Sequence, residues 1–236
     1  MRAIIKEKEE VARDTLLVVF DLQGEELDYK PGQYFWVELL NAPYDDEKGL
    51  RRHITCVMSP TERGVLGLAT RIRDTAFNKS LVELPVGAEV EVEHPKGDFA
   101  LPEETDREYV FIAGGIGITV FRTMLRYIAD EQLPYKITLL YSNRDRESTA
   151  FLDQLQEFEQ TISDFKLVAT MTGDHSWEGE TRRIDEQFLH DHLGGDLGGY
   201  TYLVAGPPPM VEGLVEVLQN AGVPEDQIRP DRFSGY

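Results

Sequence analysis

The sequence predicts a two-domain fold, a six-stranded antiparallel β-barrel followed by an α/β domain with a parallel sheet. Three observations lead to this prediction. The 236 residues exceed one typical domain and fall short of three. Short β-rich runs separated by turn residues fill the first part of the chain. Beyond a polar, proline-containing segment at 101–107, strand and helix patterns alternate. We therefore expect a barrel domain over 1–102 and an α/β domain over 107–236.

The first domain is expected to contain six strands and one helix. Its β-rich runs, several with alternating apolar and polar residues, are Ile4–Arg13, Thr15–Leu22, Gln33–Leu40, Arg52–Pro60, Val65–Arg73 and Ala88–His94. Turn signals such as Lys30-Pro31-Gly32 separate these runs. A helix is expected over Thr75–Leu84, with Asp74 or Thr75 as its N-cap.

In the second domain, apolar strand runs alternate with helical patterns. The expected strands are Tyr109–Ala113, Ile137–Ser142, Phe165–Thr170 and Tyr200–Ala205, and the expected helices are Thr119–Asp130, Thr149–Gln160, Asp185–Leu193 and Met210–Ala221. Alternation of this kind predicts a parallel sheet covered by helices.

The charge balance excludes several classes of partner. The chain has 24 basic and 43 acidic residues, a net charge of −19. Such a chain is not expected to bind nucleic acid or an anionic membrane surface. The acidity is typical either of salt-adapted proteins or of an ordinary soluble acidic surface. No run approaches the roughly 18 apolar residues of a membrane-spanning helix, and the first residues hold no apolar signal core. A soluble, cytoplasmic protein without membrane insertion is therefore expected.

Metal and thiol chemistry are not expected. The single cysteine, Cys56, excludes a disulfide framework, a four-thiolate zinc site and an iron–sulfur cluster held by this chain alone. It is expected to be a small buried apolar residue. The pair in His190-Asp191-His192 is two apart in an expected helix, where the two side chains point apart. The acidic stretch Asp45-Asp46-Glu47 is expected to be a solvated loop.

Two loops of the second domain carry the strongest local motifs. Ala113-Gly114-Gly115-Ile116-Gly117-Ile118-Thr119 lies between an expected strand and helix, where glycines let a phosphate approach the backbone and the helix N-terminus offers N–H groups. Ala205-Gly206-Pro207-Pro208-Pro209-Met210 also follows a strand. Since the carboxyl ends of parallel strands line the ligand crevice, both loops are expected to face it. Each pattern is also compatible with a tight turn that binds nothing.

A third motif, Arg52-His53-Ile54-Thr55, lies on an expected barrel strand. An arginine followed three residues later by a hydroxyl could bind a phosphate and the polar edge of a ring, although both are ordinary strand residues. In order and spacing, the three motifs together resemble the ferredoxin–NADP reductase family of flavoproteins, over nearly the whole chain. Arg52–Thr55 is similar to the family's flavin motif Arg-x-Tyr-Ser/Thr. Further similar segments are Pro31–Tyr34, Leu84–Val90, His94–Phe99 and Asp231–Tyr236.

The resemblance implies FAD as cofactor, NAD(P)H as hydride donor, and a separate acceptor such as ferredoxin or another electron-transfer protein. Arg52 would pair with the FAD pyrophosphate, and Thr55 would bond near the reactive ring nitrogen. Ile54 stands where the family has a flavin-stacking aromatic residue. The other implied FAD-binding residues are His53, Thr70, Arg71, Ile72, Ala76, Phe77 and Asn78. The implied nucleotide-binding residues are Gly115, Gly117, Thr119, Gly206, Pro207 and Pro208. Tyr236 would cover the flavin, and Thr55 and Tyr236 are the implied catalytic residues.

Coenzyme preference and two alternative functions stay open. Arg144 and Arg146 follow an expected strand and would pair with a 2′-phosphate, whereas the intervening Asp145 would repel one. A modest preference for NADPH is expected. One alternative is a flavin or ferric reductase with a small-molecule acceptor. The other is a nucleotide-binding sensor domain without flavin, which the missing aromatic at Ile54 would allow.

Overall fold

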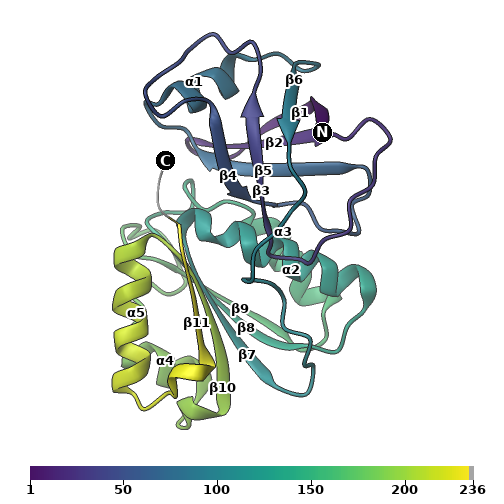
Figure 1. The fold of residues 1–236 in the computed structure, drawn as a ribbon. Helices are drawn as coiled ribbons and strands as arrows, with labels where there is room; N and C mark the ends of the chain where they lie inside the picture. The colour runs from purple at the N-terminus through teal and green to yellow at the C-terminus, as the bar shows by residue number, and fades with distance from the viewer. Residues whose placement is uncertain (234–236) are drawn as a thin grey trace. The chain divides into compact units, whose positions relative to one another are not determined.

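The structure, a computed structural model, describes residues 1–233 and divides them into two compact units (Figure 1). The first unit contains Met1–Leu101 together with the helical segment Arg122–Tyr127, and the second contains Pro102–Phe121 and the chain from Ile128 onward. Tyr236, which was expected to cover the flavin, lies outside the described residues. None of the helices in residues 1–233 combines the length and apolar character needed to span a bilayer.

An antiparallel sheet of six strands forms the first unit, in the order β4-β3-β6-β1-β2-β5. The strands, and the helix that lies between β5 and β6 in sequence, are β1 (Arg2–Ala12), β2 (Thr15–Asp21), β3 (Tyr34–Leu39), β4 (Arg51–Thr55), β5 (Val65–Arg71), α1 (Ala76–Glu83) and β6 (Glu89–Val92). The six expected strands and the expected helix are confirmed, with Thr75 as the N-cap.

β4 ends at Thr55, so the prediction that this strand continues to Pro60 is wrong. The chain changes partners just after β4, because Val57 N donates a hydrogen bond to Gly67 O in β5 at 2.9 Å. β4 and β5 are the two edges of the sheet in its hydrogen-bonded order. This bond therefore draws the edges toward each other, as the closure of a barrel requires.

Alternation along the strands positions the core of the first unit. In β3, Phe35 and Val37 are fully buried, whereas Trp36 is half-buried and Glu38 is exposed. The Phe35 ring meets the ring of Phe20 in β2 edge to face, with 6.2 Å between centroids. Side chains that alternate between two faces are the physical reason why this stretch was predicted as a strand.

Five parallel strands form the sheet of the second unit, in the order β11-β10-β7-β8-β9. The elements are β7 (Glu108–Gly114), α2 (Ile118–Glu131), β8 (Lys136–Asn143), α3 (Leu152–Thr161), β9 (Phe165–Met171), α4 (Glu186–Leu193), β10 (Tyr200–Gly206), α5 (Pro208–Asn220) and β11 (Ile228–Arg232). Phe111 of β7 stacks on Phe121 of α2, with 4.7 Å between centroids. Val110 and Ile112, on the other face, belong to the core that α4 and α5 cover. This is the predicted parallel sheet with helices on both faces.

The sequence pattern predicts four of these strands and misses β11. Its five residues include Pro230 and three charged side chains, so it offers neither an apolar run nor alternation. β11 is an edge strand that pairs with β10, and an edge tolerates a proline because one row of backbone groups needs no partner. The parallel register places Asp231 beside Ala205, at the carboxyl end of β10.

Candidate functional site

The carboxylate of Asp46 is bonded to the N-terminus of α1. Thr75 Oγ1 accepts a hydrogen bond from Asn78 N at 3.2 Å, and the first helical N–H, that of Ala76, donates to Asp46 Oδ2 at 2.9 Å. The Ala76 bond is the main cause that lowers the pKa of Asp46, and the charge of Arg52 lowers it further. The loop of Asp45–Glu47 is exposed, as expected, and Asp46 in addition bonds to α1, where the helix dipole favours its negative charge.

Arg52 of β4 lies beside the same turn. Its side chain is only 4% exposed. Its Nη1 donates to the carbonyl oxygens of Lys48 at 3.1 Å, Gly49 at 2.8 Å and Arg51 at 2.8 Å. The guanidinium carbon lies 5.3 Å from the centroid of the Phe77 ring. A guanidinium and a helix N-terminus in one place are suited to a phosphate group.

Asn78 completes the group of buried residues around this turn. Its side chain is 4% exposed, and Nδ2 donates to Thr75 Oγ1 at 3.1 Å. Within residues 1–233, its Oδ1 has no hydrogen-bond partner. A buried acceptor without a partner costs about 1–3 kcal/mol, so a donor from a ligand would be stabilised there. Of the expected FAD-binding residues, the structure thus brings together Arg52, Ala76, Phe77 and Asn78, and the guanidinium of Arg52 with the N–H groups at the start of α1 fits a pyrophosphate.

The remaining residues of the β4 motif do not share one face. Successive strand residues point to opposite faces, so His53 lies on the face opposite Arg52. The His53 ring is 4.9 Å from the ring of Trp36 and 5.4 Å from that of Tyr34, and burial lowers its pKa. Thr55 is buried at the end of β4. The structure therefore places His53 in an aromatic cluster and away from the Arg52 side of the strand.

Three further expected residues lie at the end of β5, the other edge strand. Thr70 and Arg71 close its ladder with β2, in register with Leu16 and Thr15, and both are half-buried. Ile72, just beyond the strand, is exposed, and its N–H donates to the carbonyl oxygen of Asp14 in the turn between β1 and β2. In the sheet order these residues lie on the edge opposite β4.

In the second unit, the two glycine-containing loops touch each other. The 3₁₀ turn η1 (Gly115–Gly117) joins β7 to α2, and Gly115 has a positive φ of 51°. A Cβ on Gly117 would lie 2.8 Å from Gly206 Cα and would overlap the Ala205 carbonyl. The sequence suggested that these glycines admit a phosphate. The structure adds that Gly117 is required for the loops after β7 and β10 to pack together.

Thr119 and the prolines fix the start of the two helices. Thr119 is 1% exposed, and its hydroxyl donates to Ile116 O at 3.0 Å. Pro207 is the N-cap residue of α5, and Pro208 is its first helical residue, where a missing N–H costs nothing. Gly206 therefore lies directly against the η1 turn and Pro207 beside Gly114, whereas the Thr119 hydroxyl is turned into the protein.

Of the two arginines expected at a 2′-phosphate, Arg144 is exposed at the end of β8. The Nη2 of Arg146 forms an exposed ion pair with Asp153 Oδ1 at 3.0 Å. Asp145 Oδ1 accepts from Ser148 N at 2.8 Å, so its carboxylate is held inside the turn. The Ser148 hydroxyl donates to the carbonyl oxygen of Asp145 in the same turn. Helix α3 therefore begins at Leu152, three residues later than the expected Thr149.

Two polar residues near this end of the sheet, Asn143 and the half-buried Asp231, were not predicted as site residues. Both amide atoms of Asn143, the last residue of β8, are buried and have no hydrogen-bond partner in the described part of the chain. Burial raises the pKa of Asp231 on β11. Asn143 looks like an ordinary strand terminus. Asp231 begins a segment that resembles the family, but Pro230 hides the strand that holds it.

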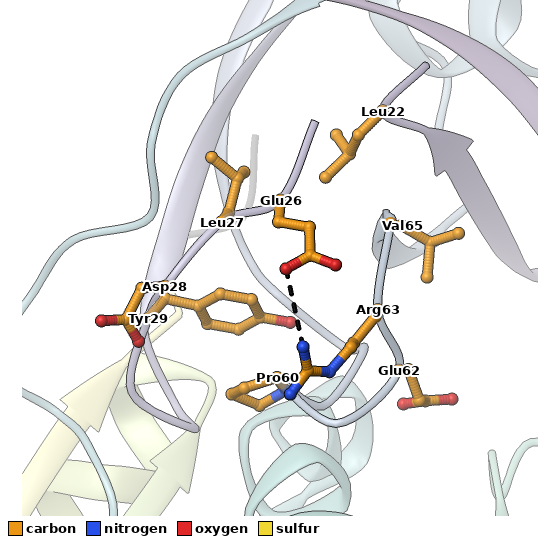
Figure 2. Close-up of a pocket in the computed structure, with 10 residues that line it drawn as sticks. Leu22, Glu26, Leu27, Asp28, Tyr29, Pro60, Glu62, Arg63 and Val65 are labelled. Carbon is orange, nitrogen blue, oxygen red and sulfur yellow. Dashed lines mark ion pairs between the residues drawn. The ribbon is translucent and has the colours of Figure 1, made fainter. Parts of the chain in front are cut away.

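A pocket of about 270 Å³ in the first unit is separate from these residues. Figure 2 shows its lining, in which Arg63 faces Glu26 at 3.6 Å. None of the expected site residues lines it. Cys56 is fully buried, as expected, with its Sγ 3.4 Å from the Tyr29 hydroxyl. Burial raises the pKa of its thiol to about 11, so it is not a nucleophile at neutral pH.

Comparison with protein families gives one match for each part of the chain. Residues 2–101 match the oxidoreductase FAD-binding domain, and residues 111–216 match the oxidoreductase NAD-binding domain. Together the two matches leave out only the first residue, the segment between them and the C-terminal end.

Among curated proteins, the chain is similar to the reductase component of propane 2-monooxygenase from Rhodococcus jostii, with 27% identity over 88% of this chain and 56% of that protein. It is 27% identical to NADH-cytochrome b5 reductase 1 from Eremothecium gossypii over 78% of this chain and 66% of that protein. It is 26% identical to the NADPH nitrate reductase of Emericella nidulans over 96% of this chain. The chain spans between 29% and 66% of the length of these relatives.

Solved structures share the fold. The ferredoxin reductase in carbazole 1,9a-dioxygenase is 25% identical, with a TM-score of 0.81 over 99% of this chain and 69% of that one. The FAD/NAD-binding domain of a nitric oxide dioxygenase from Vibrio cholerae is 18% identical, with a TM-score of 0.85 over 98% of both chains, which shows the fold alone.

Proposed function

Because the chain belongs to the ferredoxin–NADP reductase-like oxidoreductases, with an FAD-binding domain followed by an NAD-binding domain, we propose that it oxidises NAD(P)H and delivers the electrons to a separate acceptor. The observation that carries the proposal is the presence of both domain matches in one chain. FAD, when bound, supplies hydride acceptance and onward transfer of one or two electrons.

The residues are given the following roles. Arg52 and the N–H groups at the start of α1 hold the FAD pyrophosphate, and Thr55 bonds to the flavin ring. The turn of Gly115 and Gly117 holds the nucleotide phosphates, and the Gly206–Pro208 segment lines the nicotinamide side. The exposed Arg144 favours NADPH by pairing with its 2′-phosphate.

We propose ferredoxin or another electron-transfer protein as the acceptor. Two curated relatives are by name a reductase component and a cytochrome b5 reductase, which supports an acceptor on another protein or domain. This chain has one cysteine and cannot itself ligate an iron–sulfur cluster. Because its net charge is −19, an acidic acceptor would associate faster as ionic strength rises and screens the repulsion.

A second candidate is a flavin or ferric reductase with a small-molecule acceptor, which one observation favours. Arg52 is almost fully buried and already donates to three backbone carbonyls. A cofactor that must compete with these bonds would exchange more readily than one that meets a free guanidinium. Loss of flavin during gel filtration would favour this candidate, and retention would favour electron transfer to a protein.

The FAD site is tested by Arg52→Ala, with Arg51→Ala as the matched control. Loss of a charge-assisted hydrogen bond costs roughly 1.5–3 kcal/mol, so the dissociation constant for FAD should rise about ten- to hundredfold. Arg51 is exposed and pairs with Glu93, so its replacement should leave FAD affinity unchanged. Both variants are checked for folding by circular dichroism. A folded Arg52→Ala variant with the parent's affinity would refute the assignment.

A further inference from the structure

The loop between β3 and β4 occupies the groups assigned to the FAD pyrophosphate. Asp46 Oδ2 accepts the hydrogen bond of the first helical N–H of α1, at 2.9 Å from Ala76 N. Two residues further along, the carbonyls of Lys48 and Gly49 accept from Arg52 Nη1 at 3.1 and 2.8 Å. One short segment thus engages both groups that would otherwise bind phosphate oxygens.

The segment has a defined conformation of its own. Gly49 N donates to Asp46 O at 2.9 Å, which closes a tight turn, and Lys48 N donates to Asp46 Oδ1 at 2.9 Å. Gly49 has a positive φ of 64°. The turn therefore fixes the Asp46 carboxylate and the two carbonyls in one arrangement, with one negative charge and several oxygen acceptors, as a phosphate group would present.

Of the three acidic residues Asp45, Asp46 and Glu47, it is Asp46 that bonds to the start of α1. Asp45 and Glu47 are exposed and equally charged, but neither is bonded to α1. The first turn of α1 contains no acidic residue, so Asp46 supplies its negative charge from 30 residues away in sequence.

We propose that the Asp46–Gly49 loop is an internal competitor of the FAD pyrophosphate, and that Asp46 thereby sets the affinity of the protein for FAD. This rests on the proposed FAD site. The loop's bonds to Arg52 use one of its nitrogens, Nη1, whereas Ala76 has a single N–H, so the cofactor and Asp46 compete for Ala76 N and Asp46 withdraws when FAD binds. The apparent affinity is the intrinsic affinity reduced by the fraction of molecules in which the loop is withdrawn.

The test is a titration of flavin-free protein with FAD, followed by quenching of flavin fluorescence, for the parent and for Asp46→Asn and Asp46→Ala. The Asn variant removes the charge and the Ala variant also removes the hydrogen-bond acceptor. Both should bind FAD about two- to fivefold more tightly, the scale of one charge at a helix terminus. Glu47→Gln removes the same charge one residue away and should leave the dissociation constant unchanged.

Riboflavin, which has no phosphate, separates this competition from a general change in the flavin site. Its affinity should be the same in the parent and in both Asp46 variants. The proposal is overturned if the Asp46 variants bind FAD like the parent, or more weakly, or if Glu47→Gln tightens FAD binding equally. Equal tightening of riboflavin and FAD would also overturn it. If no protein in the set binds FAD, the proposed function itself fails, which is a different outcome.

Discussion

Arg144 offers an exposed guanidinium at the carboxyl end of β8, and Arg146, two residues away, is paired with Asp153. We therefore expect Arg144→Ala to lower kcat/KM for NADPH about ten- to hundredfold, the cost of one charge-assisted hydrogen bond, and to affect NADH little. Arg146→Ala is the control and should have a smaller effect. The comparison is made by steady-state kinetics with both coenzymes. Equal losses for NADPH and NADH would mean that Arg144 does not contact the 2′-phosphate.

Individual site residues can be predicted from the sequence where they belong to a recognisable motif. The family resemblance implies Arg52, Ala76, Phe77 and Asn78 among a larger set of FAD-binding residues, and the structure brings these four together around the start of α1. Asp46 was not predictable, because an acidic loop residue looks the same whether it meets water or caps a helix. What distinguishes it is a tertiary contact across 30 residues, which no local pattern encodes.

The junction of β7 and β10 can be tested with two glycines of the second unit. A Cβ on Gly117 would overlap the backbone of Ala205, so Gly117→Ala should lower the free energy of unfolding of this unit by about 1–3 kcal/mol. Gly213, inside α5, faces open space, and Gly213→Ala should raise it by about 0.5–1 kcal/mol. Urea denaturation measures both. A neutral Gly117→Ala variant would show that the two loops are not in contact.

Elements with a regular period were predictable, and elements fixed by their surroundings were not. The alternation in β3 and the apolar run of β7 mark both as strands from the sequence pattern alone. β11 has neither signal, and it forms because the open edge of β10 supplies its partner. The end of β4 is set in the same way by the bond from Val57 to Gly67, a contact between segments that are separate in sequence.

At the scale of the whole molecule, each of the two units has one binding task. The first unit matches the FAD-binding family and contains the Arg52 site, and the second matches the NAD-binding family and contains the two glycine loops. Each unit has its own sheet, and each sheet supplies a frame for the turn that we propose to bind phosphate groups. The proposed reaction requires both ligands on the same chain.

The central claim, that NAD(P)H reduces FAD bound to this chain, is tested most directly by a visible spectrum. The purified protein is loaded with FAD, freed of excess flavin and oxygen, and titrated with NADPH or NADH. The visible flavin absorption should be lost with about one equivalent of coenzyme, since a hydride carries two electrons. Free FAD at the same concentration is the control and should stay oxidised over the same time. Bound FAD that keeps its full absorption in the presence of both coenzymes would contradict the account.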